Sequence, residues 1–94
     1  MATGALQKKM MADQGYMTVA DAAKVTGQNY STIYRYMTER GIPNRKVGNR
    51  WYIEVKTLAA YYRKQDWRSP YVTMLAAAMV KLRAIRVKQD PITV

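Results

Sequence analysis

The stretch TVADAAKVTGQNYSTIYRYMTERG, residues 18–41, is typical of two helices joined by a tight turn. Thr18 can cap the first helix, and Asp21 three residues later completes a pattern like that of a capping box. The carboxylate of Asp21 also suits the positive end of the helix. Gly27 is expected to end this helix, because glycine takes the left-handed C-cap conformation at little cost.

A second helix is expected over residues 30–40, with Asn29 as a favourable N-cap and Gly41 to close it. At about 100° per residue, one side of this helix is mainly apolar. That side is formed by Ile33, Tyr36 and Met37. It is expected to pack on the first helix, whose body is small and rich in alanine.

The other side of the second helix carries hydrogen-bonding side chains and no purely aliphatic one. It consists of Tyr30, Ser31, Tyr34, Arg35 and Thr38. Such a face suits the reading of bases in the major groove of DNA. A solvated surface helix also has a polar outer face, so both interpretations stay open on these residues alone.

A β-hairpin is expected after these helices, because Ile42-Pro43 cannot continue a helix and Gly48-Asn49 is a two-residue turn signal. On its second arm we expect Trp51 and Ile53 to be buried against the helices, with Tyr52 on the other face. The polar residues that remain near the outer surface are Arg45, Lys46, Asn49 and Arg50. Basic side chains on a projecting hairpin suit phosphates or the minor groove, although they also protect a sheet edge from pairing.

A third helix is expected over residues 55–64. Apolar and aromatic residues recur in it at helical spacing and would close the core. These residues are Val55, Leu58, Tyr61 and Tyr62.

The composition is strongly basic for a chain that can form one domain with a modest core. The 94 residues include 16 Lys and Arg against 6 Asp and Glu, a formal charge of +10. A small chain with this charge most often meets a polyanion, either nucleic acid or an anionic membrane. We favour nucleic acid.

Catalytic and metal-binding chemistry has little support in the composition. There is no Cys and no His, and the carboxylates form no obvious cluster. The commonest general base and the commonest metal ligands are therefore missing. We expect no enzyme activity, no cofactor and no metal site.

A cytoplasmic location is expected, because the lack of Cys fits a reducing compartment. The first residues include Lys8 and Lys9 but no apolar segment of the kind found in signal peptides. The longest apolar run, residues 71–80, is too short to span a bilayer. No membrane partner is expected.

Ser69-Pro70 marks the start of a C-terminal helix that runs to about residue 88. An apolar stripe follows a 3-4-3 spacing along it and consists of Val72, Leu75, Met79 and Leu82. This helix could fold back onto the small core, pair with a second copy, or dock on a partner or membrane surface. We favour a homo-oligomer, because residues 74–80 are apolar nearly all round. The basic end would then add phosphate contacts from Lys81, Arg83, Arg86 and Lys88.

Five short segments, in order, resemble the excisionase and MerR-like winged helix-turn-helix family. They are YMTVADAA at 16–23, STIYR at 31–35, RGIP at 40–43, KVGNRWYI at 46–53 and LAAY at 58–61. Together they cover about half of the chain. The resemblance implies a small DNA-binding domain whose second helix enters the major groove and whose hairpin, the wing, touches the minor groove or backbone.

The resemblance assigns base reading to Tyr30, Ser31, Tyr34 and Arg35. It assigns wing contacts to Lys46, Asn49 and Arg50. The chain departs from the family at Tyr52, where an arginine is common. Members of the family include recombination directionality factors, transcription regulators and DNA-recognition domains of phage terminase small subunits.

The predicted fold is mainly α with a small β-hairpin wing, a winged helix-turn-helix with an added C-terminal helix. We expect a flexible arm or frayed helix at residues 1–15 and the DNA-binding domain at 16–64. A connector at 65–69, the C-terminal helix at 70–88 and a tail at 89–94 would follow. The helix of residues 30–40 and the wing are the predicted DNA contacts, and the C-terminal stripe is the predicted oligomerisation surface.

The predicted function is sequence-specific binding of double-stranded DNA, as a transcriptional repressor or an excisionase-type recombination directionality factor from a phage or similar element. The alternative is a protein-interaction adaptor that docks a recombinase or another phage protein, such as a packaging motor, with DNA binding secondary. General RNA binding is disfavoured, because neither the polar helix face nor the wing is expected to offer a stacking surface.

Overall fold

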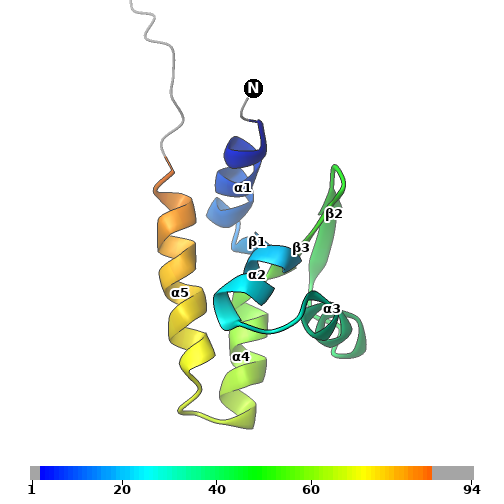
Figure 1. Ribbon diagram of the computed structural model, residues 1–94, viewed down its shortest axis with the longest axis vertical. Coiled ribbons are helices and arrows are strands. Elements are labelled where there is room, and N and C mark those ends of the chain that lie inside the picture. The colour runs from blue at the N-terminus through cyan, green and yellow to red at the C-terminus, as the bar shows by residue number, and fades with distance from the viewer. Residues whose placement is uncertain (1–2, 86–94) are drawn as a thin grey trace, which may run out of the picture.

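Five helices and three short strands make up the part of the chain that the computed structural model describes, residues 3–85 (Figure 1). The elements follow in the order α1 (Thr3–Asp13), β1 (Tyr16–Thr18), α2 (Val19–Thr26), α3 (Tyr30–Glu39), β2 (Asn44–Val47), β3 (Arg50–Glu54), α4 (Val55–Gln65) and α5 (Pro70–Arg83). The predicted winged helix-turn-helix with a C-terminal helix is confirmed.

The helices α2 and α3 begin and end close to the predicted residues. The Thr18 hydroxyl accepts a 2.9 Å hydrogen bond from the amide of Asp21, as a helix cap does. Gly27 ends α2 with a φ of 73°. Gly41 has a φ of 63° just after α3, where the chain must turn toward the hairpin.

The sheet is antiparallel, with strand order β1-β3-β2. Val47 pairs with Arg50, so the predicted two-residue turn at Gly48 and Asn49 is confirmed. Strand β1 was not predicted. With 3 residues it is too short to show the alternation of polar and apolar residues by which strands are found.

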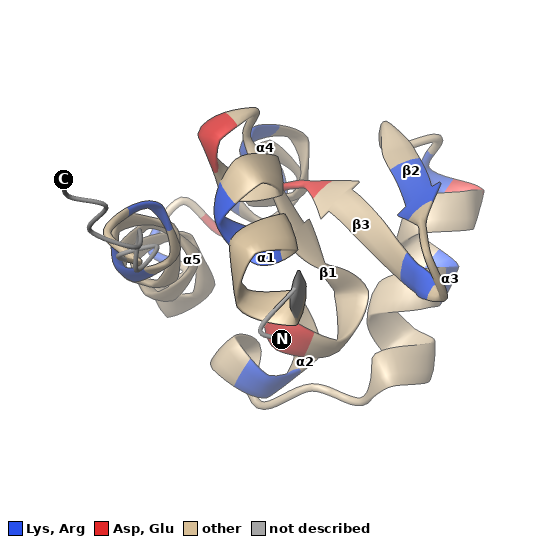
Figure 2. Ribbon diagram, turned by 90° about the horizontal axis from the view of Figure 1, so that it is seen from above, with Lys and Arg blue, Asp and Glu red and all other residues tan. Residues whose placement is uncertain are grey.

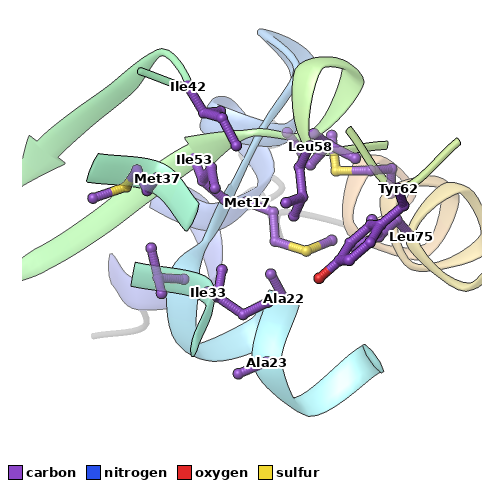
Figure 3. Packing of buried hydrophobic residues seen from close by; sticks show 14 residues of the cluster. Met17, Ala22, Ala23, Ile33, Met37, Ile42, Ile53, Leu58, Tyr62 and Leu75 are labelled. Atoms are coloured by element: carbon purple, nitrogen blue, oxygen red, sulfur yellow. The ribbon is translucent and has the colours of Figure 1, made fainter. Parts of the chain in front are cut away.

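One hydrophobic core joins α2, α3, α4, α5 and the sheet. Ile33, Ile53, Leu58 and Leu75 are fully buried in it. Figure 3 shows Ile33, Met17 and Leu58 pointing toward one another between α2, α4 and the sheet. The small alanines of α2 allow α3 to lie close against it, so α3 is held by its apolar side.

The N-terminal segment was expected to be a flexible arm or a frayed helix, and Thr3–Asp13 forms a helix, α1, that packs on the rest of the molecule. Met11 and Ala12 are buried, and Lys8 Nζ lies 3.2 Å from Asp21 Oδ2. Helix α1 packs on β1 on one side and on α5 on another. Because its apolar contacts are divided between two neighbours, its sequence shows no single apolar stripe.

The C-terminal helix α5 folds back onto α1, α2 and α4 (Figure 1). Leu75 is 0% and Met79 4% exposed, while Val72 and Leu82 pack against the core and are partly buried. The predicted oligomerisation stripe is therefore corrected, because its side chains close the core of their own chain. A winged domain of about fifty residues has little burial of its own, and α5 adds to it.

Helix α5 also ends earlier than predicted, at Arg83 instead of about residue 88. Arg83 Nε donates a 2.9 Å hydrogen bond to the carbonyl of Ala12 in α1. The predicted phosphate contacts of Arg86 and Lys88 lie outside the described residues.

Candidate nucleic-acid interface

The outer face of α3 is exposed as predicted. The residues predicted to read bases all lie on this face, with Tyr30 46% and Tyr34 36% exposed. Ile33 and Met37 are buried on the opposite side of the helix. Within residues 3–85 no element covers this face, which lies at the side of the molecule away from α5 (Figures 1 and 2).

The hairpin residues alternate between two faces of the sheet. Lys46 is paired with Trp51, and both side chains lie on the face toward α3. Lys46 Nζ is 5.7 Å from the centre of the Trp51 ring, within reach of a cation–π interaction. Trp51 meets Tyr34 of α3 edge to face, with ring centres 6.1 Å apart. Helix and hairpin thus form one continuous surface.

Arg45 and Arg50 lie on the opposite face of the hairpin, toward α1. Arg45 donates a 2.7 Å hydrogen bond to Gln14 Oε1, and its guanidinium lies 4.9 Å from the ring centre of Tyr16. The guanidinium of Arg50 lies over the first turn of α1, where a Cβ on Gly4 would come within 3.3 Å of Nη1. The three predicted basic residues of the wing are therefore divided between two directions.

Burial was expected for Trp51 and Ile53, with Tyr52 on the outer face, and only Ile53 is buried as expected. Trp51 is partly buried, whereas Tyr52 is fully buried in a second cluster with Met11 and Tyr16. The Tyr52 hydroxyl donates a 2.8 Å hydrogen bond to Gln7 Oε1 of α1, and burial raises the pKa of its phenol. The reason is α1, which covers the face of the sheet that we expected to be open.

Lysine and arginine residues occur on the hairpin and α3, as the blue segments of the ribbon in Figure 2 show, and also on the other helices. The acidic Glu54 lies at the other end of β3, next to α4. Basic residues therefore lie on both sides of the junction between the exposed face of α3 and the hairpin, which suits a polyanion.

A set of exposed aromatic rings at this surface was missed by sequence reasoning. Tyr30 and Tyr34 are nearly parallel, with an interplanar angle of 12° and ring centres 6.2 Å apart, and Trp51 continues the row. The spacing of four residues signals the first pair. The contact with Trp51 depends on the packing of the hairpin on α3. This corrects the expectation that the interface has no stacking surface.

Residues 3–85 contain neither a cluster of metal ligands nor a helix that could cross a membrane. No group of three His, Cys, Asp or Glu there could hold a metal ion. Among the helices of this region, none combines the length and apolar character needed to cross a membrane.

A family model described as a helix-turn-helix domain matches residues 16–66, more than half of the chain. The match runs from β1 to the end of α4 and includes α3 and the hairpin, while α1 and α5 lie outside it. Comparisons with curated proteins and with solved structures gave no match.

Proposed function

Because the chain belongs to the helix-turn-helix domain family and is a DNA-binding protein on that account, we propose that it reads a specific duplex sequence with α3 in the major groove. The exposed outer face of α3 beside the basic hairpin is the observation that carries this proposal. A helix is about 10–12 Å wide, which matches the width of the major groove of B-DNA. The buried apolar side of α3 holds the helix rigidly in this position.

Arg35 is the side chain best suited to specify a base, since it is exposed on the central turn of α3 and its fork can bond guanine bidentately. Ser31 and Tyr34 lie within one turn of it and offer hydroxyl groups. Lys46 and Asn49 of the hairpin are then placed for the neighbouring phosphates or the minor groove. Arg45 is held by Gln14 and Tyr16 and contributes mainly positive potential.

The role that follows is a transcriptional repressor or a recombination directionality factor, which acts by binding DNA and not by catalysis. Several copies bound to repeated or inverted sites would bend the DNA and present it to a partner such as a recombinase. Support comes from the small size of the domain and from the clear division between a reading helix and a basic hairpin.

A second candidate function is that of an adaptor for a partner protein, such as a phage packaging factor. Three large apolar side chains are exposed away from α3, on the α4–α5 connection and on α5: Trp67 (75%), Val80 (65%) and Met74 (42%). Exposed apolar residues of this size favour contact with another protein or another copy of this chain.

Selection of bound duplexes from a random DNA pool, at about 0.15 M salt, tests the first proposal. An enriched motif that changes with Arg35→Ala is the expected result. Recovery of no motif, with binding that is lost steeply as salt rises, means that the charge binds backbone alone. That result would overturn base reading by α3 and favour the adaptor.

A further inference from the structure

A pocket of about 290 Å³ lies where the start of α2, the start of α3 and the hairpin turn meet. Two of its lining residues are aromatic, Tyr30 of α3 and Trp51 of β3. Its polar lining includes Asn49 at the hairpin turn and Arg50 at the start of β3. It borders the exposed face of α3 and includes Tyr30 of the predicted base-reading set and Asn49 of the hairpin.

The two aromatic side chains offer flat apolar surface to a ligand. Tyr30 is 46% exposed, and the row of rings from Tyr30 through Tyr34 to Trp51 is continuous. A base inside a B-form duplex has both faces in the stack and offers only its edges to a protein. Exposed aromatic rings therefore gain most from a base whose faces are free, which is an unpaired one.

The remaining lining suits the other parts of a nucleotide. Asn49 carries an amide that can both donate to and accept from the edge of a base. Arg50 supplies positive charge on the α1 side of the pocket. Lys8 and Asp21 also line this side, where their ion pair at 3.2 Å balances the two charges. The pocket thus contains aromatic residues for the face of a base, the Asn49 amide for its edge and positive charge for its phosphate.

We infer that this pocket takes one unpaired nucleotide of the bound DNA. The base stacks on Tyr30 and Trp51 and bonds Asn49, while its phosphate lies near Arg50. The inference rests on the proposed function, because it requires the α3 surface to face DNA. The protein then binds a duplex with an extrahelical nucleotide at the matching position about tenfold more tightly than the perfect duplex, in the range of stacking one base on an aromatic side chain.

The test uses fluorescence anisotropy with a labelled duplex that carries the selected motif. A single-nucleotide bulge is moved stepwise along this duplex, and each affinity is compared with that of the perfect duplex at the same salt. Tighter binding at one or two adjacent positions is expected. Equal or weaker binding at every position, with the motif intact, overturns the pocket assignment and leaves duplex reading in place. Where the selection returns no motif, bulged and perfect duplexes of arbitrary sequence give the same comparison, so the two failures are distinguishable.

Two variants separate stacking from a general loss of binding. Tyr30→Ala is expected to bring the ratio of bulged to perfect affinity close to one. Trp67→Ala removes an exposed aromatic ring on the side away from α3 and is expected to keep the ratio. Equal effects of both variants on the ratio overturn the assignment.

A spectroscopic readout reports the base directly. The chain has 2 tryptophans, so Trp67→Phe leaves Trp51 as the only one. The fluorescence of Trp51 should be quenched more by the preferred bulged duplex than by the perfect duplex at saturation.

A free nucleotide, instead of an unpaired nucleotide of DNA, could also occupy this pocket. Competition by deoxynucleoside monophosphates at micromolar concentration, together with no preference for bulged DNA, assigns the pocket to free nucleotides and overturns its assignment to DNA.

Discussion

Trp51 and Tyr52 are neighbours in β3, yet they belong to two different regions of the molecule. Trp51 lies on the open side, defined here as the outer face of α3 with Lys46 and Trp51, and it stays partly exposed. Tyr52 lies on the covered side, where α1 packs on the sheet, and it is fully buried. An aromatic residue of this strand therefore contributes to stability where another element packs on its side of the sheet, and is available for recognition where none does.

The largest difference between the two sides is expected in stability. Tyr52→Ala should lower the free energy of unfolding by about 3–5 kcal/mol, because it empties a fully buried site and frees Gln7 of α1. Trp51→Ala should cost less, since Trp51 is already partly exposed. Urea denaturation of both variants measures the two losses in free energy of unfolding. Equal losses would contradict the expected difference between the two sides.

Helix α5 supports the covered side, because it packs on α1. Leu75→Ala is expected to lower the free energy of unfolding by about 2–5 kcal/mol. The molar mass in solution should stay that of the wild type, since Leu75 is buried in its own chain. Calorimetry and light scattering measure the two quantities. A change of oligomeric state with little loss of stability would restore the pairing role of the stripe.

On the open side, substitutions should change DNA binding and leave stability nearly unchanged. Arg35→Ala is expected to weaken binding of the preferred duplex by about 1–3 kcal/mol and to relax the preference at one base pair. Its thermal midpoint should stay close to that of the wild type, because Arg35 is exposed. Titration of matched and mismatched duplexes measures the effect, and a uniform loss on all sequences would assign Arg35 to the backbone.

The main core, to which Tyr62 of α4 belongs, predicts a pH dependence of stability. Burial raises the pKa of Tyr62, whose hydroxyl donates a hydrogen bond to Gln28 Oε1. The unfolded chain loses this proton near pH 10.0, before the folded chain does. The contribution of the protonated Tyr62 to the free energy of unfolding is therefore complete below pH 10. It is lost as pH rises above 10, and the free energy of unfolding then falls by up to about 1.4 kcal/mol per pH unit. Tyr62→Phe should flatten this slope in unfolding experiments between pH 9 and pH 11, the approximate limits set by the tyrosine range.

The smallest expected effect is on the salt dependence of DNA binding, which should differ between the two faces of the hairpin. Lys46→Ala should reduce the slope of log affinity against log salt by about 1, as the loss of one phosphate contact does. Arg45→Ala should leave the slope nearly unchanged, because Gln14 and Tyr16 hold its guanidinium on the covered side. Titrations on one duplex at several salt concentrations measure both, and the reverse order would place the covered face on the DNA.

Much of the domain could be predicted from short segments. Thr18, Gly27 and Gly41 mark the ends of α2 and α3, and Gly48-Asn49 marks the hairpin turn. Each signal acts over four or five residues, through a hydrogen bond or a backbone conformation that few residue types adopt. The polar face of α3 followed from the same local periodicity.

The parts that were predicted wrongly all depend on contacts between distant segments. Helix α1 divides its apolar residues between two neighbours, so no stripe marks it. The apolar stripe of α5 has the same spacing whether it pairs with a second copy or covers the core of its own chain. The alternation in β3 showed that Trp51 and Tyr52 face opposite ways, but the burial of Tyr52 follows from α1 alone.

The sequence by itself determined the helix-turn-helix, the hairpin and the basic charge, because these depend on neighbouring residues and on composition. Only the tertiary structure decided which hairpin face stays open, which cations remain available, and that Tyr30, Tyr34 and Trp51 form one aromatic row. The physical reason is that burial is a property of pairs of surfaces. A segment encodes its own apolar face, and the fold decides which surface covers it.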